Sequence, residues 1–463
     1  MADTTSPPPK LRRPAVDIKR LENGTLIMRS PYELPEPPSA NVGAWLRRWA
    51  AEDPERLFIS KYAGDGQWFS LSYGDAYKHL QPIAQNLLKR KLSAERPLMI
   101  LSKNGIENAL LQLAAMDVGI PAIHLSPSMS LDPARKDDLA RVLGQTSPGL
   151  VFAADGEPFA DALGMAHAAG AEIVVDAEPP SNVPATPFHK LIKSWRTGAA
   201  KKAYDKLTPE TIAKISYMGD GAALTGVVAS QQTLCANQDA LAALIPFLTQ
   251  RPPIVVDDAP WYLSGTGGLV FFMVLRNGGT LYIDRFGEEN RVEDFTSPSP
   301  TVHVTDLPAL SSLIPRLEED KLLRSGFFRQ VELIWVVGAT PDANLRARLR
   351  RMTQMEKRAE IPVITSFSSG KTMTVNSLMY FDTEADENIG LPLPGSYLKM
   401  AARGDLFELR VKTHGPGPRQ WQKYQAQPLT TDDEGYFTTG DIVTLVDEML
   451  PFKGVVRFGR FDS

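Results

Sequence analysis

The sequence predicts an α/β fold with two doubly wound layers, followed by a small β-rich unit. Three observations support this prediction. Short apolar stretches alternate with segments of helical periodicity between residues 57 and 175, and a second such series begins at residue 211. A proline-rich stretch at 176–188 separates the two series, and from about residue 391 short strands and turns replace them. Such alternation is typical of a parallel sheet with helices on both faces.

The first series opens with two strands, at 57–63 and 68–71, that are expected to form a hairpin over Gly64 and Gly66. A helix with apolar side chains at helical spacing is expected at 75–92. The other elements expected in this series are strands at 97–101, 150–153 and 172–175, a helix that runs to about residue 118, and a helix at 158–169.

Capping signals mark three helix ends in this series. Asn104 and Glu107 have the spacing of a capping box, which predicts a helix start at this point. Asp132 followed by Pro133 predicts an N-cap with proline at the first helical position. Gly144 lies where the C-terminal cap of that helix is expected.

The second series and the end of the chain complete the expected fold. Strands are expected at 212–217, 254–256, 281–283, 302–304, 333–337 and 362–365, and helices at 232–245 and 266–275. The β-rich unit contributes strands at 397–401, 406–411, 436–438 and 454–458. We therefore divide the chain into a disordered lead (1–15), a first αβ subdomain (16–190), a second αβ subdomain (191–388) and a β-rich subdomain (389–463).

Composition excludes several classes of protein. The 463 residues can form two or three compact units, and 43% hydrophobic with 22% charged residues is ordinary for a globular protein. A net charge of −4 argues against nucleic acid as the main partner. A single cysteine, Cys235, fits a reducing compartment. The most apolar run, 263–275, is too short to span a bilayer, so we expect a soluble, cytoplasmic protein without a membrane span.

The stretch at 211–230 contains the strongest candidate for a ligand site. A buried strand breaks into a loop of small residues that includes Gly219 and Gly221, and a second strand resumes at about residue 227. Glycine permits the backbone conformations that turn N–H groups toward an anion, so the loop is a candidate phosphate site. A tight turn between two strands is the alternative interpretation.

The segments around this loop resemble the adenylate-forming acid–CoA ligases, most closely feruloyl-CoA synthetase. The resemblance rests on TIAKISY, GVV and LCANQ, and it extends from about Arg13 to the last residue through SPGLVFAADG, MVLRNGGTLYID, IGLPLPG and EGYFTTGD. It implies the large N-terminal domain of that fold. It also implies ATP-dependent activation of an aryl or other carboxylic acid to an acyl-adenylate and then transfer to CoA, with ATP/AMP and CoA as cofactors.

The loop departs from the family's motif, Thr-Ser-Gly-Ser/Thr-Thr-Gly-x-Pro-Lys-Gly. Residues 218–226 are one residue shorter, and Thr225, the only hydroxyl, stands where the family has a lysine. Asp220 adds a negative charge that would repel a triphosphate, and we expect no cation here to offset it. The resemblance still assigns Gly219, Gly221 and Thr225 to nucleotide binding, together with Gly338 and Thr372.

On the substrate side, the resemblance points to Trp261, Tyr262, Leu263 and Ser368. Leu263 stands where the family has a histidine. Trp261 and Tyr262 either line an aromatic acid pocket or are ordinary core residues. Next to Thr372, Met373 replaces a glutamate that helps to hold Mg²⁺, and a thioether is a poor ligand for that cation. Binding of Mg²⁺ is therefore doubtful.

The same stretch contains Ser-Gly-Lys-Thr at 369–372, which suggests a P-loop kinase-like NTPase. A Walker A motif would need a glycine at Thr365 and a helix after the Lys-Thr pair, but MTVNSLMYF has the composition of a strand. The six histidines show no metal-ligand spacing, and no Gly-x-Ser-x-Gly elbow is present. The residues therefore assign neither a metal site nor a catalytic residue.

Near the end of the chain, Asp441 matches the family's aspartate on the ribose hydroxyls, and Arg460 matches a hinge arginine that also contacts ribose. The sequence stops at Ser463, so the family's C-terminal lid domain is expected to be missing, with a separate polypeptide as a candidate partner. These departures predict a ligase-family protein with impaired or lost catalysis. Two alternatives stay open, a non-catalytic binding or regulatory module for an acid or adenine nucleotide, and a ligase completed by a separate lid.

Overall fold

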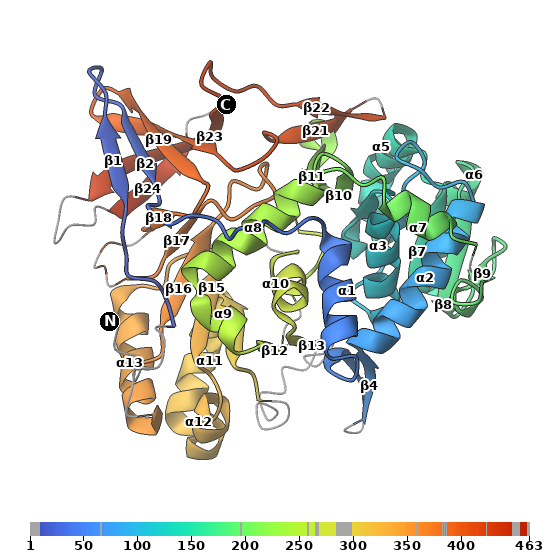
Figure 1. Cartoon of the computed structure of the whole chain (residues 1–463), viewed down its shortest axis with the longest axis horizontal. Helices are drawn as coiled ribbons and strands as arrows, with labels where there is room; N and C mark the ends of the chain where they lie inside the picture. Colours follow the sequence, from blue (N-terminus) through green and yellow to red (C-terminus); the bar gives the residue numbers. More distant parts are fainter. Residues whose placement is uncertain are drawn as a thin grey trace.

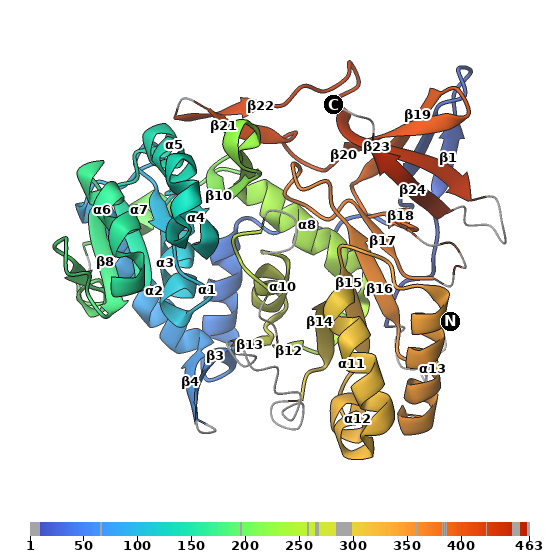
Figure 2. The same cartoon turned by 180° about the vertical axis from the view of Figure 1, so that it is seen from behind.

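The structure is a computed structural model that describes residues 10–64, 67–194, 197–256, 259–263, 268–283, 299–357, 360–381, 383, 385, 387–422, 424–446 and 454–460. Within these residues the chain forms two nine-stranded sheets and one six-stranded sheet (Figure 1). Helices lie between the two larger sheets and on their outer faces (Figures 1 and 2). The predicted α/β architecture is thus confirmed.

The first sheet carries the loop that the sequence singles out. Its order is β22-β21-β11-β10-β6-β5-β7-β8-β9. From β10 to β9 all neighbours are parallel, whereas β11, β21 and β22 are added antiparallel. The strands are β5 (Leu98–Ile100), β6 (Ala122–His124), β7 (Leu150–Asp155), β8 (Glu172–Ala177), β9 (Thr186–Pro187), β10 (Ile212–Met218), β11 (Thr225–Ser230), β21 (Arg419–Gln422) and β22 (Gln425–Pro428).

The second sheet has the order β18-β17-β16-β15-β14-β12-β13-β3-β4. The predicted hairpin, β3 with β4, is confirmed, but it joins this sheet through β13 rather than the first sheet. Strands β10 and β11, which follow residue 190, belong to the first sheet. The division of the chain into subdomains at residue 190 stays a prediction. The strands are β3 (Leu57–Gly64), β4 (Gln67–Ser72), β12 (Ile254–Val256), β13 (Thr280–Ile283), β14 (Val302–Asp306), β15 (Leu333–Val337), β16 (Val363–Phe367), β17 (Ser377–Met379) and β18 (Leu391–Pro392).

The six-stranded sheet, β1-β2-β19-β20-β23-β24, is the β-rich unit. Strands β1 and β2, at the start of the chain, were not predicted from the sequence. They pair antiparallel with each other, and β2 also pairs antiparallel with β19. The strands are β1 (Asp17–Arg20), β2 (Leu26–Arg29), β19 (Tyr397–Arg403), β20 (Leu406–Lys412), β23 (Phe437–Val446) and β24 (Gly454–Arg460). Between β2 and helix α1 (Val42–Glu52), the chain passes across helix α8 (Gln231–Leu244) (Figure 1).

The helices form an inner layer and two outer layers. Between the large sheets lie α1 (Val42–Glu52), α2 (Tyr73–Lys89), α3 (Ile106–Asp117), α8 (Gln231–Leu244) and α10 (Leu269–Asn277), which share one apolar core (Figure 1). Helices α5 (Lys136–Thr146) and α6 (Ala160–Ala168) cover the far face of the first sheet. Helices α11 (Leu307–Glu319), α12 (Lys321–Phe328) and α13 (Ala343–Lys357) cover the far face of the second. The shorter helices are α4 (Pro127–Leu131), α7 (Ala199–Tyr204) and α9 (Pro246–Gln250).

Two of the predicted helix caps are wrong. Gly105, not Asn104, is the N-cap of α3, and no side chain caps it. Gly144 lies inside α5, which continues to Thr146 and ends at Ser147, where the left-handed conformation with φ of +44° stops it. Asp132 does act as an N-cap, since its Oδ1 accepts a hydrogen bond from Ala134 N at 2.9 Å, but it caps the short 3₁₀ turn Pro133–Arg135 and not α5, which starts at Lys136.

The Ser-Gly-Lys-Thr stretch is followed by no helix in the described structure. Residues 368–376 form a turn between β16 and β17, and the strand itself covers only Ser377–Met379, less than predicted. A P-loop needs a helix N-terminus at this point to bind phosphate, so the kinase-like interpretation is wrong. Residues 264–267 of the expected helix at 266–275 lie outside the described residues. Among the described helices, none is both long and apolar enough to cross a membrane.

Candidate functional site

The glycine loop connects β10 to β11, which pair antiparallel from Met218 and Thr225 outward. Gly219 and Gly221 both have positive φ, +77° and +46°. A Cβ atom on Gly219 would lie 2.7 Å from the carbonyl oxygen of Ala223. Both the backbone conformation and the close approach therefore require glycine at this position.

Three side chains hold this loop, two from helix α5 and one, Arg135, from the 3₁₀ turn Pro133–Arg135 that precedes it. Arg135 Nη2 donates to Gly219 O at 2.9 Å, and Arg141 donates to Gly221 O. Gly221 N donates to Asp138 Oδ1 at 3.0 Å, while the same carboxylate forms an ion pair with Arg135 at 3.0 Å. The backbone N–H of Gly221, which the sequence predicted to face an anion, therefore donates to the carboxylate of Asp138.

The prediction that no cation lies near this loop is wrong. Arg135 ends the 3₁₀ turn before α5, and Arg141 lies in α5. The loop carbonyls to which they donate follow 84 and 80 residues later in the chain. Sequence spacing alone gave no signal for this contact, because the fold brings α5 to the end of β10. Asp220 is exposed, and Thr225 Oγ1 donates to Ala223 O at 3.2 Å within the loop.

The two predicted ribose contacts lie opposite each other on β23 and β24. Asp441 and Arg460 are register partners, and the Asp441 side chain is fully buried. The side chain of Arg460 lies outside the described part of the structure. Arg457, which the sequence analysis missed, has Nη1 3.8 Å from Asp441 Oδ1. Arg457 also lines a small cavity with Gly338, so the fold brings two predicted nucleotide residues to one region.

Thr372 and Ser368 lie in the turn after β16. Thr372 is buried, and its hydroxyl lies 3.3 Å from Asn376 Oδ1 and 3.2 Å from Ser369 Oγ. Ser368 Oγ accepts a hydrogen bond from Gly370 N at 3.3 Å. These hydroxyls stabilise the turn, and their assigned ligand roles stay predictions.

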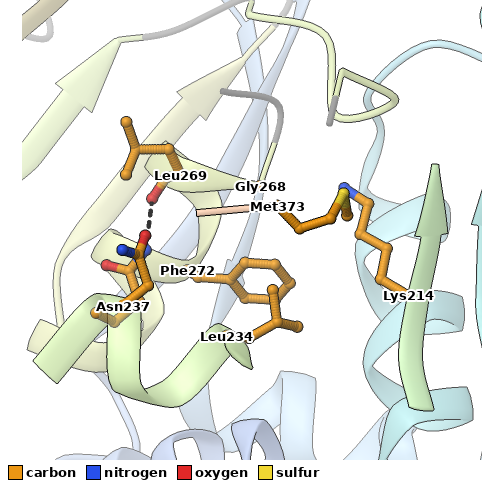
Figure 3. A pocket seen from close by; sticks show the side chains of 8 residues that line it. Lys214, Leu234, Asn237, Gly268, Leu269, Phe272 and Met373 are labelled. Carbon is orange, nitrogen blue, oxygen red and sulfur yellow. Dashed lines mark hydrogen bonds between the residues drawn. The ribbon is translucent and has the colours of Figure 1, made fainter. Parts of the chain in front are cut away.

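A buried lysine that the sequence analysis did not single out lies in the same part of the fold. Lys214, in the middle of β10, is 1% exposed, and its ammonium donates to Trp261 O. Burial lowers its pKa to about 7 because a charged group loses its hydration there. The pocket around it is lined by Lys214, Leu234, Asn237, Gln238, Gly268, Leu269, Phe272 and Met373 (Figure 3).

The segment around Trp261 forms part of the wall that encloses Lys214. Trp261 is buried and packs on Phe271 with ring centroids 4.7 Å apart. Asn104 binds both ends of this segment, since its amide donates to Ala259 O at 2.9 Å and its oxygen accepts from Trp261 N at 3.0 Å. Trp261 thus has the position of a core residue, which was one of the two interpretations of it. Leu263 is 41% exposed and does not line the pocket.

Met373 has a positive φ of +58° and is buried. Its side chain and that of Lys214 point toward one another across the pocket (Figure 3). A thioether does not fit the oxygen-ligand requirement of Mg²⁺. Within the described residues, no group of three or more His, Cys, Asp and Glu side chains could hold a metal ion. No chemical step is therefore assigned to a metal here.

Comparison with known proteins assigns the fold. Residues 46–415 match the family model of AMP-binding enzymes. The luciferase-like enzyme of the nonluminescent mealworm Zophobas morio is similar with a TM-score of 0.71 at 15% identity, over 94% of this chain and 98% of the other. A benzoate CoA ligase from Burkholderia xenovorans has 0.67 at 14% identity, over 91% and 80%. Coronafacic acid ligase from Pectobacterium brasiliense has 0.70 at 16% identity, over 91% and 78%. No curated protein matches the sequence.

Proposed function

This chain belongs to the AMP-binding enzyme family, and on that premise we propose that it binds an adenine nucleotide and a carboxylic acid but forms acyl-adenylate from ATP poorly. The observation that carries the proposal is the bond from Gly221 N to Asp138. A carboxylate in this position occupies a donor that would otherwise serve a phosphate oxygen. It also places a negative charge where a triphosphate would come.

The charges around the loop support the same conclusion. Asp138 and Asp220 carry two negative charges, and Arg135 and Arg141 carry two positive charges. Their sum is zero at neutral pH, so the loop offers a triphosphate no net attraction beyond individual hydrogen bonds. Adenylation depends on donors and cations held in place around the transferring phosphate, and loss of one such group costs about 10²–10³ in rate.

The resemblance to feruloyl-CoA synthetase supports an aryl acid as the acid ligand, with CoA as the acceptor in any residual ligase reaction. The name of the benzoate CoA ligase to which this chain is similar agrees with an aromatic acid. The buried Phe272, which lines the Lys214 pocket, supplies aromatic surface for such a ligand. A non-catalytic binding module for the same two ligands is the limiting case of this proposal.

AMP is expected to bind at least 10-fold more tightly than ATP. Both nucleotides share the ribose contacts proposed for Asp441, but only ATP brings its β- and γ-phosphates close to Asp138 and Asp220, where the charges of the loop region give no net attraction. Titration calorimetry at fixed ionic strength measures both affinities, with and without Mg²⁺. ATP binding as tight as AMP binding under both conditions would contradict the proposal.

Asp138→Ala is expected to strengthen ATP binding about 10-fold and to leave AMP binding unchanged, because it frees Gly221 N and leaves two cations beside the loop. Asp137→Ala is the matched control, since Asp137 is an exposed acid on the same helix. Equal responses of ATP affinity to the two substitutions would show that bulk charge, not the contact with Gly221, controls nucleotide binding.

A further inference from the structure

Lys214 brings an ammonium group into the interior without a carboxylate in its pocket. The residue is 1% exposed, and none of the described side chains that line the pocket is acidic. Its described hydrogen bond goes to the backbone oxygen of Trp261, which is a dipole and leaves the positive charge uncompensated. A buried charge without a counter-ion is costly, so an anion that entered the pocket would be stabilised.

Gln238 adds another polar side chain to the pocket. Gln238 is 3% exposed and lines the same pocket. Its Nε2 donates to Leu269 O at 3.3 Å, but its Oε1 has no hydrogen-bond partner in the described structure. An ammonium has three N–H donors. Trp261 O accepts one of these from Lys214, which leaves two donors for the carboxylate of a ligand.

The position of Lys214 decides which part of a ligand it meets. Lys214 precedes Met218, the last residue of β10, by four residues, which corresponds to about 13 Å at about 3.3 Å per residue, and the loop begins beyond it. One carboxylate cannot lie beside both the loop and the lysine. The cavity beside the lysine, about 20 Å³, has room for about one water molecule, so only the end of a ligand can reach the lysine, and only once the pocket wall moves.

We propose that Lys214 recognises a second carboxylate at the far end of the acid ligand, so that the chain prefers a dicarboxylic acid to a monocarboxylic acid. This inference rests on the proposed function, because it takes the first carboxylate to lie toward the β10–β11 loop. Met373 is the adaptable part of the wall, since a flexible thioether can move aside for the ligand. A glutamate at the same position would instead supply the counter-ion from within the protein.

The test compares ligands that differ only in the charge of the far end. Affinities are measured by calorimetry at pH 6.0 for 4-carboxycinnamate against 4-nitrocinnamate, and for azelate against nonanoate. Lys214 is charged at this pH. His124 on β6 also interacts electrostatically with Lys214. Burial, and to a smaller extent the charge of Lys214, lowers the pKa of His124 well below its usual value, so the His124 ring is neutral. We expect at least 10-fold tighter binding of the dicarboxylate in one pair or both.

Two substitutions at Met373 separate recognition from folding. Met373→Glu is expected to abolish the dicarboxylate preference, because the new carboxylate pairs with Lys214. Met373→Gln, which has the same shape without the charge, is expected to retain it. Lys214→Met is expected to abolish the preference as well. If neither ligand pair shows a preference, or if Lys214→Met or Met373→Glu retains it, the inference is overturned.

AMP binding, measured on the same samples, distinguishes the two proposals. AMP binding without a dicarboxylate preference would overturn only the inference about Lys214. A dicarboxylate preference without AMP binding would support the inference and contradict the proposed nucleotide function. Failure of both measurements would overturn both.

Discussion

Replacing Lys214 with methionine is expected to make the ligand-free protein more stable at pH 7, by about 3–5 kcal/mol. Burial lowers the pKa of Lys214 from 10.5 to about 7 in the folded chain, a difference of about 3.5 pKa units at about 1.4 kcal/mol each. Methionine fills similar space without a charge. The loss of the hydrogen bond to Trp261 O subtracts about 1 kcal/mol from the gain.

The stability advantage of the variant is expected to shrink as the pH rises. Between pH 7 and about 10.5, the unfolded chain binds a proton at Lys214 that the folded chain does not, so the native protein becomes more stable with increasing pH. Urea unfolding at pH 7 and pH 9 should show the difference between native protein and Lys214→Met fall by about 2 kcal/mol. Other titrating groups cancel in this difference.

Lys371→Met serves as the control, because Lys371 is exposed on the turn after β16. It is expected to change the free energy of unfolding little, and equally at both pH values. A constant advantage for Lys214→Met from pH 7 to pH 9 would show that Lys214 keeps its proton in the folded state. Lower stability of Lys214→Met at pH 7 would show that the contact with Trp261 outweighs the cost of burial.

The sequence predicted the fold where local pattern decides it. The strands and helices of the two αβ series were recognisable because each is a short apolar run or an amphipathic period. The assignment of strands to sheets was not recognisable from periodicity. Strands β3 and β4 read as part of the first series, yet β3 pairs with β13, which follows more than 200 residues later. Such long-range pairing leaves no trace in the spacing of apolar residues.

The candidate site was predictable only in its local parts. Gly219 and Gly221 gave a signal because their conformations require glycine. The contacts of Arg135, Arg141 and Asp138 with the same loop depend on the packing of α5 against the end of β10, and a charge pattern on one helix does not reveal it. A lysine within an apolar strand pattern was the available signal for Lys214, since lysine is almost never fully buried without a partner.

Exchanging the loop is expected to reverse the nucleotide preference of the protein. Residues 218–226 are replaced with Thr-Ser-Gly-Ser-Thr-Gly-Met-Pro-Lys-Gly, the loop of the family that the sequence resembles. The exchange removes the charge of Asp220 and adds a lysine, so each change contributes about 1 kcal/mol or more toward a triphosphate. ATP affinity should rise about 30–100-fold while AMP affinity stays within a factor of two or three.

The matched control carries methionine in place of the introduced lysine, and it should show only part of the gain in ATP affinity. ATP–pyrophosphate exchange with cinnamate and 4-carboxycinnamate, measured on both loop variants, then shows whether the tighter binding supports adenylation. Because Asp138 bonds to Gly221 N in the native loop, Asp138→Ala in the exchanged loop should add little. The contrary outcome is a loop variant that binds AMP as the native protein does and yet binds ATP no more tightly than the native protein. That result would mean that the β10–β11 loop does not face the phosphates, and the binding-module interpretation would then need a different nucleotide orientation.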